Sequence, residues 1–277
     1  MSVYEQILYQ VDDPIATITL NRPDSLNGWT MRMAAEVRHA MWQADTSPAV
    51  VGIIVTGAGR AFCAGADMGD LTTLTEGGDI RGGWPELDVA EDPSVPDDFT
   101  GEYTYLLATR KPIVAAINGP IAGMAVPIAL CCDVRFMAED APLITAFARR
   151  GLIAEWGLSW LLPRVVGTAA SMDLLISSRP ISGKEAASLG LVNASMPVDE
   201  VVAHSRNYIE EIATTCSPAS IAIIKRQLNE QAHAGLGPAE REAQRLMLES
   251  FGRPDFREGV SSFLQKRPPK FDRLGDG

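Results

Sequence analysis

The chain has 277 residues, of which 46% are hydrophobic and 21% are charged. This composition is typical of a globular protein with a sizeable core, and it excludes a disordered or collagen-like chain. Thirty-five acidic and 24 basic side chains give a formal net charge of −11, which argues against a broad surface for nucleic acid or anionic membrane. The sequence has neither an apolar run of membrane-spanning length nor a secretory signal pattern, so we expect a cytoplasmic protein.

The first part of the chain has the pattern of a parallel sheet that begins with a hairpin. Two strand-like runs, 5–11 and 15–20, flank a polar break that contains a proline, which is typical of a hairpin. Apolar residues then recur at helical spacing behind Thr30, which is a favourable N-cap residue. The continuous apolar run 50–55 predicts a strand covered on both faces. A strand–helix–strand order of this kind implies a parallel sheet.

The middle of the chain alternates loops with further strands. A glycine-rich segment, 57–69, leads into the acidic stretch 70–98, which lacks periodicity and is expected to be a long loop. The elements expected next are a helix over 99–110, a buried strand over 113–117 and a strand over 134–138.

From Ser159 onward the periodicity is mostly helical. The expected helices run from Ser182 to Gly190 and over 201–213, begin at Ser217-Pro218, and span 238–251 and 254–264. There is no tandem repeat and no linker-like change in composition. The chain is therefore expected to form one α/β folding unit that continues into a C-terminal helical extension.

Several common chemistries find no support in the residues. His39, His204 and His233 lie in helical patterns without an acidic or thiol partner at fixed spacing, so neither a catalytic triad nor a metal site is expected. Gly57-Ala58-Gly59 begins like a dinucleotide fingerprint, but Phe62 replaces its third glycine. The four cysteines form no Cys-x-x-Cys pair and fit reduced, buried thiols.

Two strand-to-loop junctions, 53–68 and 113–136, remain as candidates for chemistry. Both leave a buried strand and enter backbone rich in small residues, which lets a ligand approach the main chain closely. Two backbone N–H groups brought together in this way would form an oxyanion hole. Each junction alone fits a tight turn that requires glycine better than an oxyanion hole, so the residues by themselves leave both interpretations open.

Six segments, in order along nearly the whole chain, resemble the crotonase (enoyl-CoA hydratase/isomerase) superfamily. They are LNRPDSLNGWT at 20–30, AFCAGADM at 61–68, KPIVAAINGPIAGMAVPIALCCDVR at 111–135, GLIAEWGLSWLLPRVVG at 151–167, RPISGKEAASLGLVN at 179–193 and FLQKRPPKF at 263–271. The resemblance implies an α/β fold of the crotonase type. A ββα superhelix at 1–198 would hold the coenzyme A and active sites, and a helical trimerisation region would follow at 199–277. Members usually assemble as trimers or as dimers of trimers.

The resemblance also implies a role for the two junctions. The carbonyl oxygen of an acyl thioester would accept hydrogen bonds from the main-chain amides of Ala66 and Met124, which would stabilise an enolate-like anion. Coenzyme A would enter as part of the substrate, and neither a permanent cofactor nor a metal is expected. The residues expected to bind substrate or coenzyme A are Arg22, Ser25, Leu26, Ala64, Ala66, Asp67, Met68, Gly123, Met124, Phe263 and Lys266. Cations for the phosphates could come from Arg22, Arg60 and Lys266, although each alone also fits a solvated surface charge.

The acidic residues depart from the hydratase pattern of the family. The positions that match the two hydratase glutamates hold Pro127 and Phe147, and neither side chain can transfer a proton. A third acidic position, used by several isomerases and by a dehalogenase branch, holds Glu155. The apolar neighbours of Glu155 would raise its proton affinity toward that of a general base. Without the resemblance, Glu155 would be interpreted as a solvated loop residue.

A single carboxylate can move a proton from C2 to C4 of a 3-enoyl thioester, whereas water addition is usually divided between two groups. We therefore expect isomerisation of 3-enoyl-CoA to 2-enoyl-CoA, with Glu155, Ala66 and Met124 as the catalytic residues. Hydration of trans-2-enoyl-CoA to 3-hydroxyacyl-CoA is the close alternative, and a non-catalytic acyl-CoA-binding protein is a further one. The expected partners are an acyl-CoA thioester and other copies of the chain, with no nucleic acid and no membrane.

Overall fold

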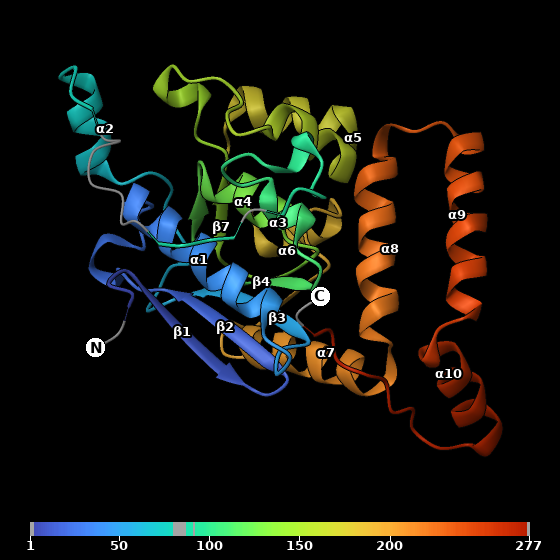
Figure 1. Cartoon of the computed structure of the whole chain (residues 1–277). Coiled ribbons are helices and arrows are strands. Elements are labelled where there is room, and N and C mark those ends of the chain that lie inside the picture. Colours follow the sequence, from blue (N-terminus) through green and yellow to red (C-terminus); the bar gives the residue numbers. More distant parts are fainter. Residues whose placement is uncertain (1–2, 80–86, 91, 276–277) are drawn as a thin grey trace.

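The computed structural model describes residues 3–79, 87–90 and 92–275. A six-stranded sheet in the order β1-β2-β3-β4-β6-β9 forms its centre (Figure 1). The strands are β1 (Ile7–Asp12), β2 (Ile15–Leu20), β3 (Gly52–Gly57), β4 (Ile113–Ile117), β6 (Val134–Ala138) and β9 (Ala194–Met196). β1 and β2 pair antiparallel, and all other neighbouring strands pair parallel. The predicted parallel sheet that begins with a hairpin is therefore confirmed.

Helices cover the central strands. In the view of Figure 1, α1 (Met31–Thr46) lies above the sheet and α7 (Val201–Thr215) lies below it. Thr30 caps α1 as expected, because its Oγ1 accepts a hydrogen bond from the Met33 N–H at 3.1 Å. Every residue of β3 and β4 is buried, which agrees with the continuous apolar runs that predicted these strands.

A second, smaller sheet was not predicted from the sequence. It consists of β5 (Ile121–Ala122), β7 (Pro142–Ile144) and β8 (Ile181–Ser182). Strands of two or three residues are too short to show a period, so hydrophobic patterning does not detect them. The helices that accompany this sheet are α4 (Ala125–Cys131), α5 (Leu158–Ser177) and α6 (Gly183–Ser188).

Two expectations for the segment between β3 and β4 were wrong. The stretch 70–98 was expected to be a loop, yet its first residues belong to α2 (Met68–Thr75). Residues 80–86 and 91 of this stretch lie outside the described part of the chain. The helix expected over 99–110 is reduced to α3 (Tyr105–Ala108), preceded by the 3-10 turn η2 (Asp97–Phe99). The Thr104 hydroxyl accepts the Gly101 N–H at 3.1 Å, a local bond that competes with continuous helix.

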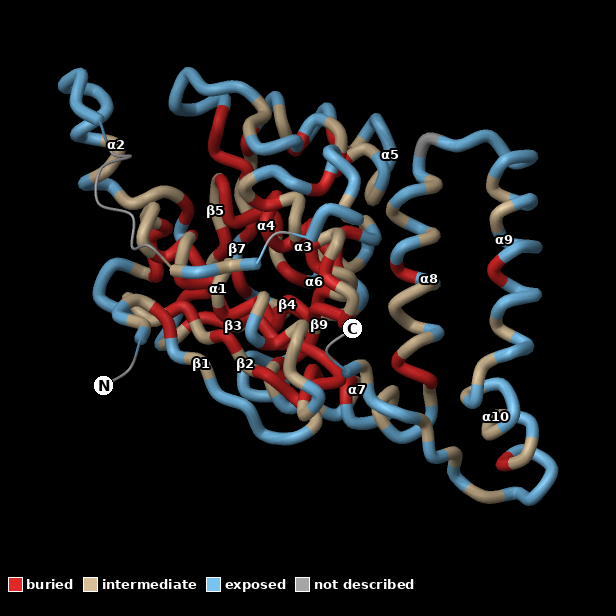
Figure 2. The backbone as a smooth tube through the Cα atoms, viewed as in Figure 1, coloured by how far each residue is buried: buried red, intermediate tan, exposed pale blue. Residues whose placement is uncertain are grey.

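The C-terminal region is helical, close to the expected bounds. Its helices after α7 are α8 (Pro218–Glu230), α9 (Leu236–Phe251) and α10 (Pro254–Gln265). The buried Lys225 ammonium fastens α8 to the core, because it donates to Asp133 Oδ2 at 2.8 Å and to two backbone carbonyls. By contrast α9 and α10 are largely exposed (Figure 2). Within the described part of the chain, no helix combines the length and apolarity needed to cross a membrane.

The boundary expected at residue 198 falls between β9 and α7. However, α7 packs on the sheet with Val201, Ser205 and Ile209 buried, so the first helix of the predicted C-terminal region shares the hydrophobic core. The division of the chain at this point therefore stays a prediction.

The loops that follow β3 and β4 touch backbone to backbone. Cys63 forms an isolated parallel bridge with Ile121, in which the Ala122 N–H donates to the Cys63 carbonyl at 3.0 Å. Gly65 follows with a φ of +94°, and a Cβ added there would lie 2.9 Å from the Ala122 carbonyl oxygen. Both the backbone conformation and the close approach therefore require glycine at this position.

Replacing Gly65 by alanine should destabilise the fold more than the same change at Gly190. Both glycines have a positive φ, but a Cβ at Gly190 meets nothing within 4 Å, so Gly190→Ala carries only the conformational cost. Gly65→Ala adds a clash with the Ala122 carbonyl, and we expect it to lower the free energy of unfolding by roughly 1–3 kcal/mol more, as for other overpacked sites. Urea denaturation of both variants measures the difference, and equal losses would show that the contact does not restrict residue 65.

Candidate active site

Asn27 fastens the turn that follows β3. Its fully buried side-chain amide donates to three carbonyl oxygens within 58–62, at 2.8–3.2 Å. Its side-chain oxygen accepts the Arg22 N–H at 2.9 Å, so the turn at 22–28 and the turn after β3 are held together. Because buried carbonyls require partners, this one side chain fixes the course of the loop that leads to Ala66.

The Ala66 amide lies in a short parallel bridge with Trp29. The Trp29 N–H donates to the Gly65 carbonyl at 2.8 Å, and the Asp67 N–H donates to the Trp29 carbonyl at 3.0 Å. These two hydrogen bonds are formed by the Gly65 carbonyl and the Asp67 N–H, which flank Ala66. Its own N–H donates to no backbone acceptor among the described residues and is available to a ligand.

The Met124 amide lies at the second junction, where the chain leaves β5 and enters α4. The Gly123 N–H donates to the Ile144 carbonyl at 3.0 Å, whereas the Met124 N–H has no backbone acceptor within the described segments. A Cβ on Gly123 would lie 3.8 Å from the Gly65 Cα. Ala66 and Met124 each follow one of these two neighbouring glycines, so the structure brings both predicted amides to one place.

Glu155 is the ionisable residue among the three acidic positions of the family. Pro127 is buried within α4, and Phe147 is 5% exposed at the 3-10 turn η3 (Ala148–Arg150). Glu155 itself is half-buried, and burial raises its pKa above the ordinary value even though a hydrogen bond from Trp156 opposes the shift. A raised pKa favours proton exchange with substrate near neutral pH.

The loop that carries Glu155 has an unusual backbone. Gly151, Trp156 and Gly157 all have positive φ, at +72°, +56° and +72°. Glycine adopts this conformation freely, but a bulky residue such as Trp156 adopts it only under constraint from its surroundings. The Trp156 ring packs edge-on against Tyr103, with ring centroids 4.9 Å apart, so Trp156 takes part in packing.

A hollow of about 450 Å³ opens beside this loop, between η2, α3, the start of α5 and the end of α8. Trp156 and Gly157 line it directly after Glu155, and its aromatic wall includes Phe99 and Trp160. The hollow can therefore hold an apolar group beside the loop that carries Glu155.

The structure clusters most of the predicted coenzyme A residues. The Ala64 N–H donates to the Leu26 carbonyl at 3.0 Å, exposed Ser25 directly precedes Leu26, and exposed Met68 begins α2 at the end of the Ala64 loop. Arg22 ion-pairs with Asp67 at 2.7 Å. Although burial alone would raise the Asp67 pKa, the Arg22 and backbone hydrogen bonds outweigh it and lower that pKa.

Two other predicted contacts lie elsewhere in the single chain. Phe263 and Lys266 are exposed on and just after α10, at the end of the molecule opposite α2 in Figure 1. Arg60 is exposed in the turn after β3. In the described ranges no group of His, Cys, Asp and Glu side chains is suited to hold a metal ion.

Sequence reasoning missed Asn27, Trp29 and Tyr103. Asn27 has a φ of +56° and precedes Gly28, and an Asn-Gly pair is a recognisable sign of left-handed backbone. For Trp29 and Tyr103 no such local sign exists, because their importance comes from contacts between distant segments.

Nearly the whole chain matches known proteins. A model of the family described as enoyl-CoA hydratase/isomerase matches residues 10–273. The chain is 33% identical over 270 residues to the 1,2-epoxyphenylacetyl-CoA isomerase of Escherichia coli (strain K12), and this match covers 96% of the chain and 98% of the relative. It is 34% identical over 276 residues to a probable enoyl-CoA hydratase of Rhodobacter capsulatus, with 97% and 98% covered.

The fold agrees with this match. The crystal structure of a probable enoyl-CoA hydratase/isomerase from Mycobacterium abscessus superposes with a TM-score of 0.83 at 27% identity, and covers 97% of this chain and 98% of its own. The expected crotonase fold is thereby confirmed, and the chain belongs to the enoyl-CoA hydratase/isomerase family of enzymes.

Proposed function

We propose that this enzyme moves the double bond of an enoyl-CoA thioester between the 3- and 2-positions. The thioester carbonyl oxygen accepts hydrogen bonds from the Ala66 and Met124 amides, and Glu155 removes a proton from C2 and returns it to C4. The negative charge that develops on the oxygen of the dienolate is stabilised by donors that are already in place. A donor of this kind typically lowers the barrier by about 2.7–4 kcal/mol.

The observation that carries this proposal is the apolar character of the two hydratase positions. Pro127 and Phe147 are buried and cannot ionise, whereas Glu155 is half-buried with a raised pKa. Adding water across a double bond requires one group to activate the water and another to protonate Cα, while a proton shuttle requires only one. A dry site also protects the dienolate from side reactions.

The substrate would occupy the loops and the hollow described above. Its acyl group enters the hollow beside Trp156, and its coenzyme A part follows Leu26, Ala64 and Met68. A phosphate that approaches Arg22 competes with Asp67, so exposed Arg60 is the more available cation. These assignments rest on the match to the family and on the proximity of the two loops.

We also propose that copies of the chain associate through the C-terminal helices, as a trimer or as a dimer of trimers. Large apolar side chains are exposed on α8, α9 and α10. They are Ile224, Leu228, Leu236, Met247, Leu248, Phe251, Phe256, Val260, Phe263 and Leu264. Apolar exposure of this extent is typical of an interaction surface. In such an assembly, Phe263 and Lys266 would reach a coenzyme A bound to another copy.

Hydration is the second candidate function, because several similar proteins are named probable enoyl-CoA hydratase. In that case Glu155 would have to act with a second group that activates water. The wild-type products distinguish the two functions.

Glu155→Gln should lower kcat by about a hundredfold or more, because the amide keeps the shape of the side chain but cannot act as a base. Since burial raises the Glu155 pKa, wild-type kcat should fall at acidic pH with a midpoint above the ordinary glutamate value of 4.5. Initial rates on a 3-enoyl-CoA between pH 4 and pH 9 measure both effects. An unchanged rate in Glu155→Gln would remove this residue from the mechanism.

The stability of the same variant provides the control. When folding raises the pKa of a carboxyl group, the group's contribution to stability is fully present below the pKa that it has in the unfolded chain. This contribution is lost as the pH rises through the pKa that the group has in the folded protein. Glu155→Gln has no charge to bury, so its free energy of unfolding at pH 7 should equal or slightly exceed that of the wild type. If the variant is less stable than the wild type, its lost activity would have to be explained by damage to the fold.

Given trans-3-enoyl-CoA and trans-2-enoyl-CoA of matched length, the wild type should interconvert them faster than it forms 3-hydroxyacyl-CoA. The reason is the absence of an ionisable side chain at Pro127 and Phe147. Chromatography of the products over several chain lengths measures the two rates. A kcat/KM for hydration well above that for isomerisation would contradict the proposed function.

A further inference from the structure

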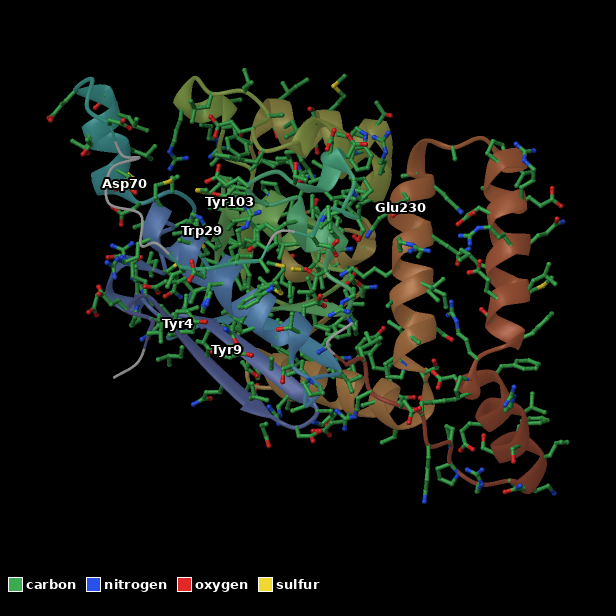
Figure 3. The ribbon with its side chains drawn as sticks, in the orientation of Figure 1. Tyr4, Tyr9, Trp29, Asp70, Tyr103 and Glu230 are labelled. Carbon is green, nitrogen blue, oxygen red and sulfur yellow. The ribbon has the colours of Figure 1, made fainter. Side chains whose placement is uncertain are left out.

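Three aromatic rings connect the two halves of the candidate site. Trp29 is joined to the Ala66 loop by the backbone bridge, and its ring packs edge-on against Tyr103 at a centroid distance of 5.8 Å. Tyr103 packs in the same way against Trp156, the residue that follows Glu155. Figure 3 shows Trp29 and Tyr103 side by side. The rings thus form a continuous path from the oxyanion amide to the carboxylate loop.

The two ends of this path differ in burial. Trp29 and Tyr103 are 3% and 4% exposed, and the backbone of Trp29 is held by two hydrogen bonds. Trp156 is 39% exposed and has the positive φ that a tryptophan adopts only when its surroundings impose it. In the described part of the chain, the one ring contact of Trp156 is with Tyr103. The buried pair therefore fixes the exposed ring.

We propose that Tyr103 is a positioning residue: its ring holds Trp156 in the left-handed conformation, and thereby holds the Glu155 carboxylate at a fixed distance from the Ala66 amide. This inference rests on the proposed role of Glu155. Trp156 directly follows Glu155 in the chain, so a displaced Trp156 also shifts the backbone that carries the carboxylate.

The ring of Tyr103 performs this role, and its hydroxyl does not. The hydroxyl donates to Glu102 Oε1 at 3.5 Å, which is long for a hydrogen bond between two oxygens. Tyr103→Phe keeps both ring contacts, whereas Tyr103→Leu removes them and leaves an apolar side chain of smaller size.

We expect Tyr103→Leu to lower kcat for a 3-enoyl-CoA by about ten- to a hundredfold, since a displacement of about 1 Å in a catalytic group has effects of this size. KM should change less than threefold, and Tyr103→Phe should restore nearly the wild-type kcat. In the Glu155→Gln background, Tyr103→Leu should cause no further loss, because the residue acts through Glu155. Tyr9→Leu is the matched control, since Tyr9 packs edge-on against Tyr4 at 6.1 Å in the N-terminal hairpin and should leave kcat unchanged.

Trp156→Gly tests the same path without opening the core. Glycine adopts a positive φ freely, so this variant should fold, yet it should show the same loss of kcat. Wild-type kcat in Trp156→Gly or in folded Tyr103→Leu would overturn the inference. An equal loss from Tyr103→Leu in the wild-type and Glu155→Gln backgrounds would also overturn it, since the effect would then be merely structural. If Glu155→Gln alone keeps full activity, the proposed function fails, whatever the Tyr103 variants show.

Discussion

The backbone contact between the loops that follow β3 and β4 is the constraint on which the site depends. Gly65 and Gly123 both have positive φ, and no side chain separates their main chains. The amides of Ala66 and Met124 follow these glycines, so packing of the turns sets the direction of both N–H groups. Main-chain donors held in this way need no rearrangement when charge develops on a bound oxygen, which is the property that makes an oxyanion hole effective.

Buried polar contacts, and not surface ion pairs, hold this arrangement. Asn27 satisfies three carbonyls and one N–H within the core, and each such bond contributes about 0.5–1.5 kcal/mol net. The exposed pairs that Arg245 forms on α9 are screened by solvent and contribute little to stability. The loop geometry therefore depends on Asn27 more than on any single surface charge. The aromatic path through Tyr103 extends the same rigidity to Glu155.

The parts of the fold that could be predicted are those with a local cause. Thr30, Ser182 and Ser217 cap α1, α6 and α8 because a hydroxyl before an amphipathic run satisfies free N–H groups. The central strands were predicted because they are continuously apolar. The three-stranded sheet and the shortness of α3 have no such local cause, since they depend on pairing between distant segments or on one competing hydrogen bond.

The residues of the candidate site likewise fall into those that the sequence predicts and those that it does not. Ala66, Met124 and Glu155 were located from short motifs, and the structure shows that the first two lie at neighbouring turns. The left-handed backbone of Trp156 and its contact with Tyr103 were not predictable, because each arises from packing between segments about fifty residues apart. Phe263 and Lys266 match the family motif, yet α10 lies away from the remaining site residues within one chain (Figure 1).

The transfer of an isotopic label tests the one-carboxylate shuttle most directly. A 3-enoyl-CoA deuterated at C2 is converted in ordinary water for less than one turnover, and the product is examined by NMR and mass spectrometry. If Glu155 carries the proton between the two carbons, part of the deuterium appears at C4 of the 2-enoyl product, and this transfer disappears in Glu155→Gln. A product that contains only protium at C4, or a 3-hydroxyacyl product in place of the 2-enoyl thioester, would contradict the account.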